Sequence, residues 1–164
     1  MMYLLARLEE TLVSEWIRET GWVFFGSLIF HSLALALVVG MSLAVLWREV
    51  GFAASIPAGR FSEFIPLAKL GLLVVLLSGL LLLIAYPAKA LSNPVFYLKL
   101  TAILAALVIT WRIVASNRST DPVSGQPGAR RRLAWLGLCL WLTSVAAGRF
   151  LAYTHNVLLA SSFY

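Results

Sequence analysis

The chain has 164 residues, a length that suits a single domain. Charged residues make up 12% of it and hydrophobic residues 61%, and the mean hydropathy is +0.90. A soluble domain carries roughly 25% charged residues, so these few charges cannot cover a globule in water. The composition excludes an ordinary soluble fold and indicates that the lipid bilayer is the main partner.

The net charge of +6 comes from basic residues that stand beside apolar runs. No basic stripe is interleaved with exposed aromatic residues, so nucleic-acid binding is not expected. We interpret these cations as signals for orientation and as contacts to lipid headgroups.

Residues 1–19 are predicted to form an amphipathic helix. Apolar residues recur on one face at helical spacing: Leu4, Leu5, Leu8, Leu12 and Trp16. Such a helix can lie flat in the membrane interface. Four glutamates and two arginines in this stretch argue against a cleaved signal peptide, so the first spanning helix is expected to act as the insertion signal.

Four apolar stretches follow, at about residues 22–47, 67–86, 95–116 and 133–153. Each reaches the ~20 residues that a helix needs to cross the hydrocarbon core. In the sequence "SNP", Ser92 or Asn93 is expected to cap the third helix, with Pro94 in its first turn. Residues 117–132 are predicted to be a hydrophilic loop. The fold class is therefore all-α, an integral membrane four-helix bundle.

The basic residues predict the orientation of these helices. The first and third loops share one side and carry most of the arginines, including Arg130, Arg131 and Arg132. The positive-inside rule then places both termini on the non-cytoplasmic side of a bacterial inner membrane.

Common catalytic and metal-binding motifs are absent from the sequence. There is no Walker loop, GxSxG or HExxH, and the single cysteine, Cys139, is interpreted as a small buried hydrophobe. Catalysis by this chain alone is therefore not expected.

Three stretches resemble a family of small four-helix bacterial membrane proteins of unknown function: "SEWIRETGW…FHSLALALVVG", "LSNPVFYLK" and "WLTSVAAGRFLAY". The likeness spans about residues 12–153. Its specific parts are His31, the NPxFxxK start of the third helix and the AGRxxAY end of the fourth. The family's acidic–basic motif after the first helix is replaced by "LWREVG", so Arg48 and Glu49 receive no role from the likeness. The resemblance implies a four-helix membrane bundle and no activity.

Polar residues at membrane depth gather in one layer near the end of the bundle that carries both termini. They are His31, Lys99, Arg149, Tyr153 and His155. Because polar groups in lipid are costly, they tend to face the bundle interior for a functional reason. We predict a b-type haem with His31 and His155 as axial ligands and with Lys99 and Arg149 at the propionates, beside Tyr153.

This pattern predicts a membrane cytochrome, or the haem subunit of a larger redox complex with membrane or periplasmic partners or further copies of the chain. Two alternatives stay open. One is a cofactor-free accessory subunit, in which the small residues Gly71, Ser78 and Gly79 serve helix–helix contact. The other is a transporter or channel, although only a few polar residues lie at mid-depth: Ser42, Ser78, Thr110 and Ser144.

Overall fold

A computed structural model describes residues 7–57, 59–116 and 127–161, and the side chains of these residues except Pro127 and residues 152–161. The described chain is mostly helical, with short turns between the helices, and it contains no strand. Its elements are α2 (Leu12–Glu19), α3 (Gly21–Val50), α4 (Arg60–Glu63), α5 (Ile65–Ala85), α6 (Pro87–Leu91), α7 (Pro94–Ser116) and α8 (Pro127–Ser161). The prediction of an all-α four-helix bundle is confirmed.

Helices α3, α5, α7 and α8 are each long and apolar enough to cross a membrane. Large hydrophobic side chains cover their outer faces, among them Leu33, Leu76, Leu104 and Leu142. An apolar exterior of this size suits lipid and not water. The architecture fits a multi-pass membrane protein.

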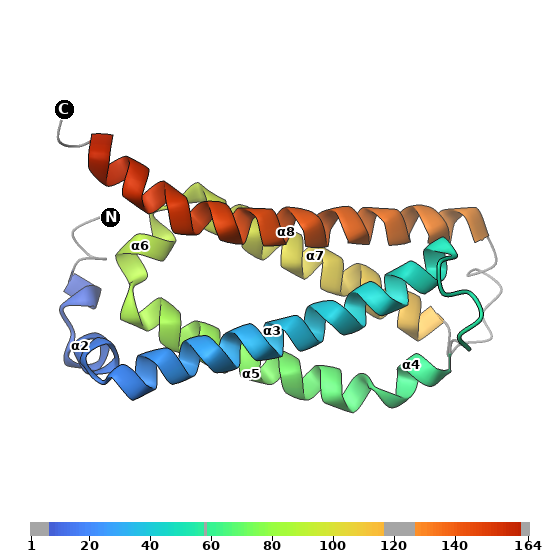
Figure 1. The fold of residues 1–164 in the computed structure, drawn as a ribbon, viewed down its shortest axis with the longest axis horizontal. Coiled ribbons are helices and arrows are strands. Elements are labelled where there is room, and N and C mark those ends of the chain that lie inside the picture. The colour runs from blue at the N-terminus through green and yellow to red at the C-terminus, as the bar shows by residue number, and fades with distance from the viewer. Residues whose placement is uncertain (1–6, 58, 117–126, 162–164) are drawn as a thin grey trace.

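The four long helices associate as two pairs. Helix α3 packs along α5, and α7 packs along α8. Helix α3 runs diagonally through the bundle, and its second half reaches α8 (Figure 1). The end of the bundle where α3 finishes and α8 begins is called the arginine-rich end below, and the opposite end, crossed by α2, is called the α2 end.

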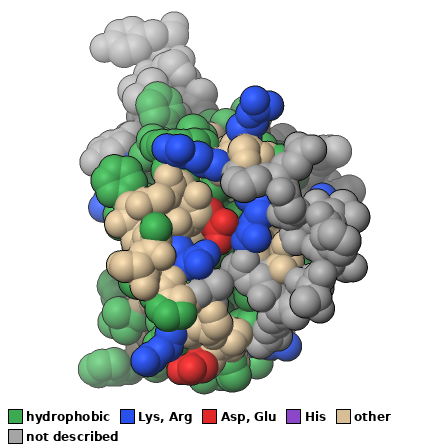
Figure 2. Space-filling model, turned by 90° about the vertical axis from the view of Figure 1, so that its right-hand side faces the viewer, with side chains coloured by type: hydrophobic (Ala, Val, Ile, Leu, Met, Phe, Trp, Pro, Cys, Tyr) green, Lys and Arg blue, Asp and Glu red, His purple; other side chains and the backbone are tan. Residues whose placement is uncertain are grey.

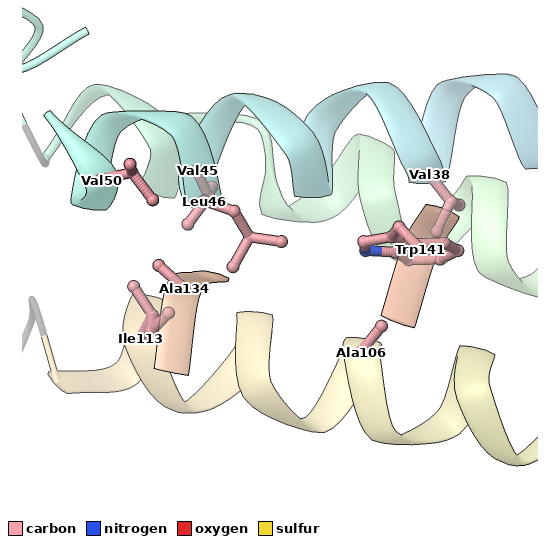
Figure 3. Close-up of a cluster of buried hydrophobic side chains, with 8 residues drawn as sticks. All are labelled: Val38, Val45, Leu46, Val50, Ala106, Ile113, Ala134 and Trp141. Atoms are coloured by element: carbon pink, nitrogen blue, oxygen red, sulfur yellow. The ribbon is translucent and has the colours of Figure 1, made fainter. Parts of the chain in front are cut away.

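The hydrophobic core lies in the half of the bundle toward the arginine-rich end (Figure 3). It joins α3, α7 and α8 through Val38, Val45, Leu46, Val50, Ala106, Ile113, Ala134 and Trp141. Leu46, Ala106 and Ala134 are fully buried, and Trp141 is 1% exposed. This cluster joins one helix pair to the other.

Glycines allow the helices to approach closely, both within each pair and between the two pairs. A Cβ added at Gly71 of α5 would lie 3.1 Å from Val38 Cγ2 of α3. A Cβ at Gly137 of α8 would lie 3.0 Å from Leu46 Cδ2. In lipid, such close backbone packing replaces the hydrophobic effect as the force that joins helices. Gly71, one of the small residues named for helix–helix contact, thus lies at a contact between two helices of this chain.

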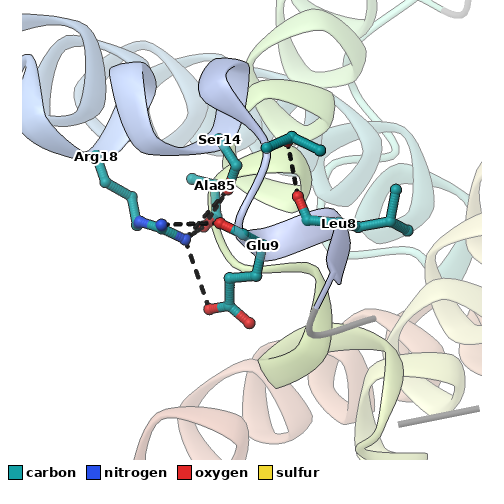
Figure 4. Close-up of polar contacts among 6 residues, drawn as sticks. Leu8, Glu9, Ser14, Arg18 and Ala85 are labelled. Carbon is teal, nitrogen blue, oxygen red and sulfur yellow. Dashed lines mark hydrogen bonds and ion pairs between the residues drawn. The ribbon is translucent and has the colours of Figure 1, made fainter. Parts of the chain in front are cut away.

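Helix α2 crosses the end of the bundle and closes the end of α5 (Figure 4). The Ala85 carbonyl accepts hydrogen bonds from Ser14 Oγ at 3.2 Å and from Arg18 at 3.1 Å. This carbonyl lies at the α5 C-terminus, where helical carbonyls lack partners in their own helix. Arg18 also donates to the Glu9 carbonyl at 2.8 Å, so one guanidinium ties α2 to α5 and to the preceding turn.

The N-terminal segment differs in part from its prediction. One helix over residues 1–19 was expected, but a turn at residues 10–11 interrupts it, and residues 1–6 lie outside the described chain. The Thr11 hydroxyl donates to the Leu8 carbonyl at this turn. Ser14 and Ile17 face the bundle, whereas the expected apolar face of Leu8, Leu12 and Trp16 points outward. This placement suits a helix in the membrane interface.

The third helix begins as predicted, because Asn93 Oδ1 accepts a hydrogen bond from the Val95 amide at 2.9 Å and α7 starts at Pro94. The predicted loop over residues 117–132 is too long, since α8 already begins at Pro127. The three arginines therefore lie in the first turns of α8. The helix also continues past the expected end at residue 153 to Ser161.

Arginines gather at the arginine-rich end around a shielded carboxylate (Figure 2). The side chain of Glu49, at the end of α3, is 9% exposed. Its Oε1 lies 2.7 Å from Arg48 and 3.1 Å from Arg130 of α8. A shielded carboxylate with two cationic donors contributes more than a surface pair. Glu49 therefore links the end of α3 to the start of α8.

Replacing Glu49 with Gln is expected to lower the free energy of unfolding by about 1–3 kcal/mol, because two arginines at a shielded site lose their carboxylate. Chemical unfolding in detergent, followed by circular dichroism, measures the loss. Glu63→Gln is the control, because Glu63 is an exposed acid at the same end. Equal stability of the two variants would contradict a structural role for Glu49.

Candidate functional site

His31 faces the partner helix α5 from the first half of α3. It is half-buried, and its Nδ1 lies 3.0 Å from Ser78 Oγ. Ser78 is 5% exposed, so this hydrogen bond lies within the α3–α5 interface. The structure therefore places His31 toward the interior of the protein and not on the lipid-facing surface.

The hydrogen bonds of Ser78 determine which ring nitrogen of His31 carries the proton. The Ser78 hydroxyl donates to the Val74 carbonyl of its own helix at 2.5 Å. A hydroxyl has one proton, so Ser78 Oγ can only accept from His31. The neutral ring is then protonated on Nδ1, which leaves the lone pair of Nε2 available. The backbone carbonyl of Val75, also in α5, acts on the same ring as a hydrogen-bond acceptor.

Gly79 provides the space that the imidazole occupies. A Cβ added at this position would lie 3.1 Å from His31 Cε1 and 3.4 Å from Nδ1. Any larger side chain would meet the ring itself. Ser78 and Gly79 together therefore set both the orientation and the depth of the imidazole. The sequence pointed to both small residues as packing positions and to Ser78 also as a polar residue at mid-depth, but not to their contact with His31.

Lys99 enters the same layer from the other helix pair. It lies on α7, six residues after the Asn93 cap, and its side chain is half-buried. The lysine stem runs along α8 at Gly148, where an added Cβ would lie 3.7 Å from Lys99 Cε. Lys99 is also close enough to His31 to act on it electrostatically. The structure thus brings together an imidazole and an ammonium that are 68 positions apart in the chain.

The remaining predicted site residues lie at the same end of α8. Arg149 is exposed on the surface of this helix, next to Gly148. Its position suits contact with a headgroup or with the edge of a ligand, but the side chain does not enter the interior. Tyr153 and His155 lie further along α8, and their side chains are outside the described residues. The predicted second axial ligand is therefore not placed.

A buried tryptophan lies below the layer of His31 and Lys99. Trp141 is two helical turns, ~10 Å, from Gly148 along α8, at the depth of Val38 and Ala106 (Figure 3). Its Nε1 is buried and has no hydrogen-bond partner among the described residues. The indole belongs to the hydrophobic core and forms the part of it that is nearer the α2 end. Sequence reasoning missed this residue, because an indole in an apolar helix resembles lipid-facing tryptophans.

Two of the mid-depth hydroxyl groups, those of Ser42 and Thr110, donate to carbonyls of their own helices. Ser42 donates to the Val38 carbonyl at 2.7 Å and Thr110 to the Ala106 carbonyl at 2.8 Å. The protons of these two hydroxyls are therefore used within α3 and α7.

Within the described ranges, no group of three or more His, Cys, Asp and Glu side chains could hold a metal ion. A cluster made by side chains alone is thus not seen there. His31 is the one histidine whose side chain the structure describes.

No protein family, curated protein or solved structure in the three comparisons matches the chain. The resemblance to the four-helix family described above therefore stays a prediction. The candidate site rests on the geometry of His31, Ser78, Gly79 and Lys99.

Replacing Gly79 with Val is expected to displace the imidazole, because the new side chain would occupy the space of the ring. Overpacking of this kind costs about 1–3 kcal/mol. Thermal unfolding in detergent measures the loss. Gly26→Val in α3 is the control, since an added Cβ there meets nothing within 4 Å. If Gly79→Val unfolds at the same temperature as Gly26→Val, the ring does not pack against Gly79.

Proposed function

We propose that the protein is a membrane-embedded electron-transfer subunit that binds haem b through His31. One observation carries the proposal: Ser78 holds Nδ1 of His31, so that Nε2 keeps its lone pair in the interior of a membrane protein. A haem iron accepts such a nitrogen. When bound, haem would supply one-electron redox chemistry that the side chains lack.

The support from His31 follows the usual construction of histidine metal sites. A ligating histidine donates its other ring N–H to a fixed acceptor, which sets the tautomer and the ring orientation. Here Ser78 Oγ is that acceptor, and the hydroxyl is itself locked by the Val74 carbonyl. Gly79 has no side chain, and it therefore leaves the space that the ring occupies.

The ammonium of Lys99 favours the binding of an anionic group near this imidazole. Its ammonium lies in the membrane margin, and no ion pair is found for it among the described residues. An ammonium in apolar surroundings favours a carboxylate partner. Haem propionates are such carboxylates, and we assign them to Lys99, with Tyr153 and the exposed Arg149 at the outer edge. His155 remains the proposed second axial ligand.

We also propose that the protein resides in a bacterial inner membrane with the α2 end on the non-cytoplasmic side. The arginine-rich end contains Arg48, Arg60, Arg130, Arg131 and Arg132, which the positive-inside rule places in the cytoplasm. The proposed haem then lies near the outer leaflet, where a periplasmic or membrane-bound redox partner can exchange electrons with it.

The visible spectrum of the purified protein tests the proposed function. Wild-type protein from haem-replete cells, or reconstituted with hemin, is expected to show a Soret band that shifts on reduction. His31→Ala is expected to lose the band, because the iron loses its ligand. Ser78→Ala is expected to keep haem at lower occupancy, because the ring loses its fixed orientation; second-shell changes of this kind cost roughly 10- to 100-fold in affinity.

Ser32→Ala is the matched control, because Ser32 is the next residue in α3, is exposed and donates only to the Leu28 carbonyl. Circular dichroism shows whether each variant stays helical. A wild type that remains colourless after hemin addition would contradict the proposal and favour a cofactor-free accessory subunit. An unchanged spectrum in His31→Ala would remove His31 from the site.

A further inference from the structure

A second site lies at the arginine-rich end, away from His31. A cavity of about 350 Å³ opens between α3, α5 and α7. Its inner wall is formed by aliphatic side chains such as Val38, Leu72 and Leu107, and its outer part by Phe61 and Phe64 of the α4 region. Ligand-binding cavities in proteins begin at roughly this size.

The cavity exists because the two helix pairs do not close on this side. Helix α5 packs on α3, and α7 packs on α8, but α5 and α7 make no extensive contact with each other. Phe64 and Trp111 on the rim are 52% and 56% exposed. In a membrane, this opening faces the lipid directly. A chain-like apolar molecule can therefore enter from the bilayer without crossing water.

Polar groups in the cavity further restrict what can bind there. Ser42 and Thr110 line the wall, but their hydroxyl protons are used by carbonyls of their own helices. Neither is available to donate to a ligand. The wall is thus suited to a hydrocarbon chain over most of its length.

Lys69 supplies the single cation of the lining. It lies in the second turn of α5, about one turn below the start of the helix at Ile65. Its Nζ stands 5.8 Å from the centroid of the Trp111 ring across the opening, and no carboxylate pairs with it in the described part of the chain. A lysine at this depth reaches the headgroup region with its ammonium.

We propose that this cavity holds one acyl chain of an anionic phospholipid, with its phosphate on Lys69. The charge of Lys69 matches the phosphate, and the apolar wall continues inward from it as an acyl chain continues from its headgroup. Exposed Arg60 and Arg112 near the same end add to the positive field at the opening. This site is independent of the proposed haem and of any redox activity.

Native mass spectrometry of the full-length protein tests the site. The protein is released from detergent micelles that contain equal amounts of phosphatidylglycerol and phosphatidylcholine with the same acyl chains. Wild-type protein is expected to retain one phosphatidylglycerol in preference to phosphatidylcholine. Lys69→Gln is expected to lower this preference about fivefold, the effect of one lysine near an anionic headgroup.

Two further pairs of variants distinguish lipid binding in the cavity from non-specific binding of lipid to the protein surface. Lys89→Gln removes an exposed lysine from α6 at the opposite end and is expected to leave the preference unchanged. Ala68→Phe fills the cavity and is expected to abolish retention of both lipids, whereas Ala105→Phe on the exposed face of α7 is expected to retain them.

Several results would overturn the proposal. One is equal retention of the two lipids by the wild type, and another is an unchanged preference in Lys69→Gln. Full retention of lipid by Ala68→Phe would place the lipid elsewhere. Displacement of the lipid by an uncharged isoprenoid quinone at equal concentration would identify a different occupant.

Discussion

The hydrogen bond from His31 to Ser78 is the interaction on which the proposed site depends. It lies in the interface of the tightly packed pair α3 and α5, where Ser78 is nearly inaccessible. In lipid, a polar group must find its partner within the protein. The Ser78 hydroxyl is a partner in two hydrogen bonds, because it donates to the Val74 carbonyl and accepts from His31. The proton position of the imidazole thus follows from helix packing.

Packing in two pairs explains both candidate sites. Toward the α2 end, His31 comes from one pair and Lys99 from the other, with Trp141 beneath them. Toward the arginine-rich end, α3 crosses to α8, and the core joins the pairs on one side only. The opposite side, between α5 and α7, remains apolar and open. The diagonal path of α3 therefore produces the interior layer at one end and the cavity at the other.

Much of the fold was predictable from the sequence, because the hydropathy of the spans alone places them in lipid. The cap at Asn93 and the start of α7 at Pro94 followed from local chemistry. The start of α8 did not, since three arginines resemble a loop by composition, whereas the structure places them in helical turns and pairs Arg130 with Glu49. A charge contact between distant segments leaves no local pattern in either segment.

The candidate site was predictable only in its membrane depth. His31 and Lys99 were expected in one layer because each lies at a known distance from a helix end. Which helix faces the imidazole could not be derived, because that depends on the rotation of α3 against α5. The glycines at 71 and 79 mark the packing face of α5, but nothing in the pattern links this face to His31. The indole of Trp141 and the cavity beside Lys69 likewise depend on crossing geometry.

The proton position on His31 can be measured most directly by nitrogen-15 NMR of histidine-labelled, haem-free protein in lipid. His155→Asn leaves a single labelled ring, because the chain has two histidines. We predict that Nδ1 carries the proton and that Nε2 gives the signal of an unprotonated nitrogen, and that Ser78→Ala changes this ratio. A wild-type ring protonated on Nε2 would contradict the proposed site, because the nitrogen proposed to bind iron would then hold a proton.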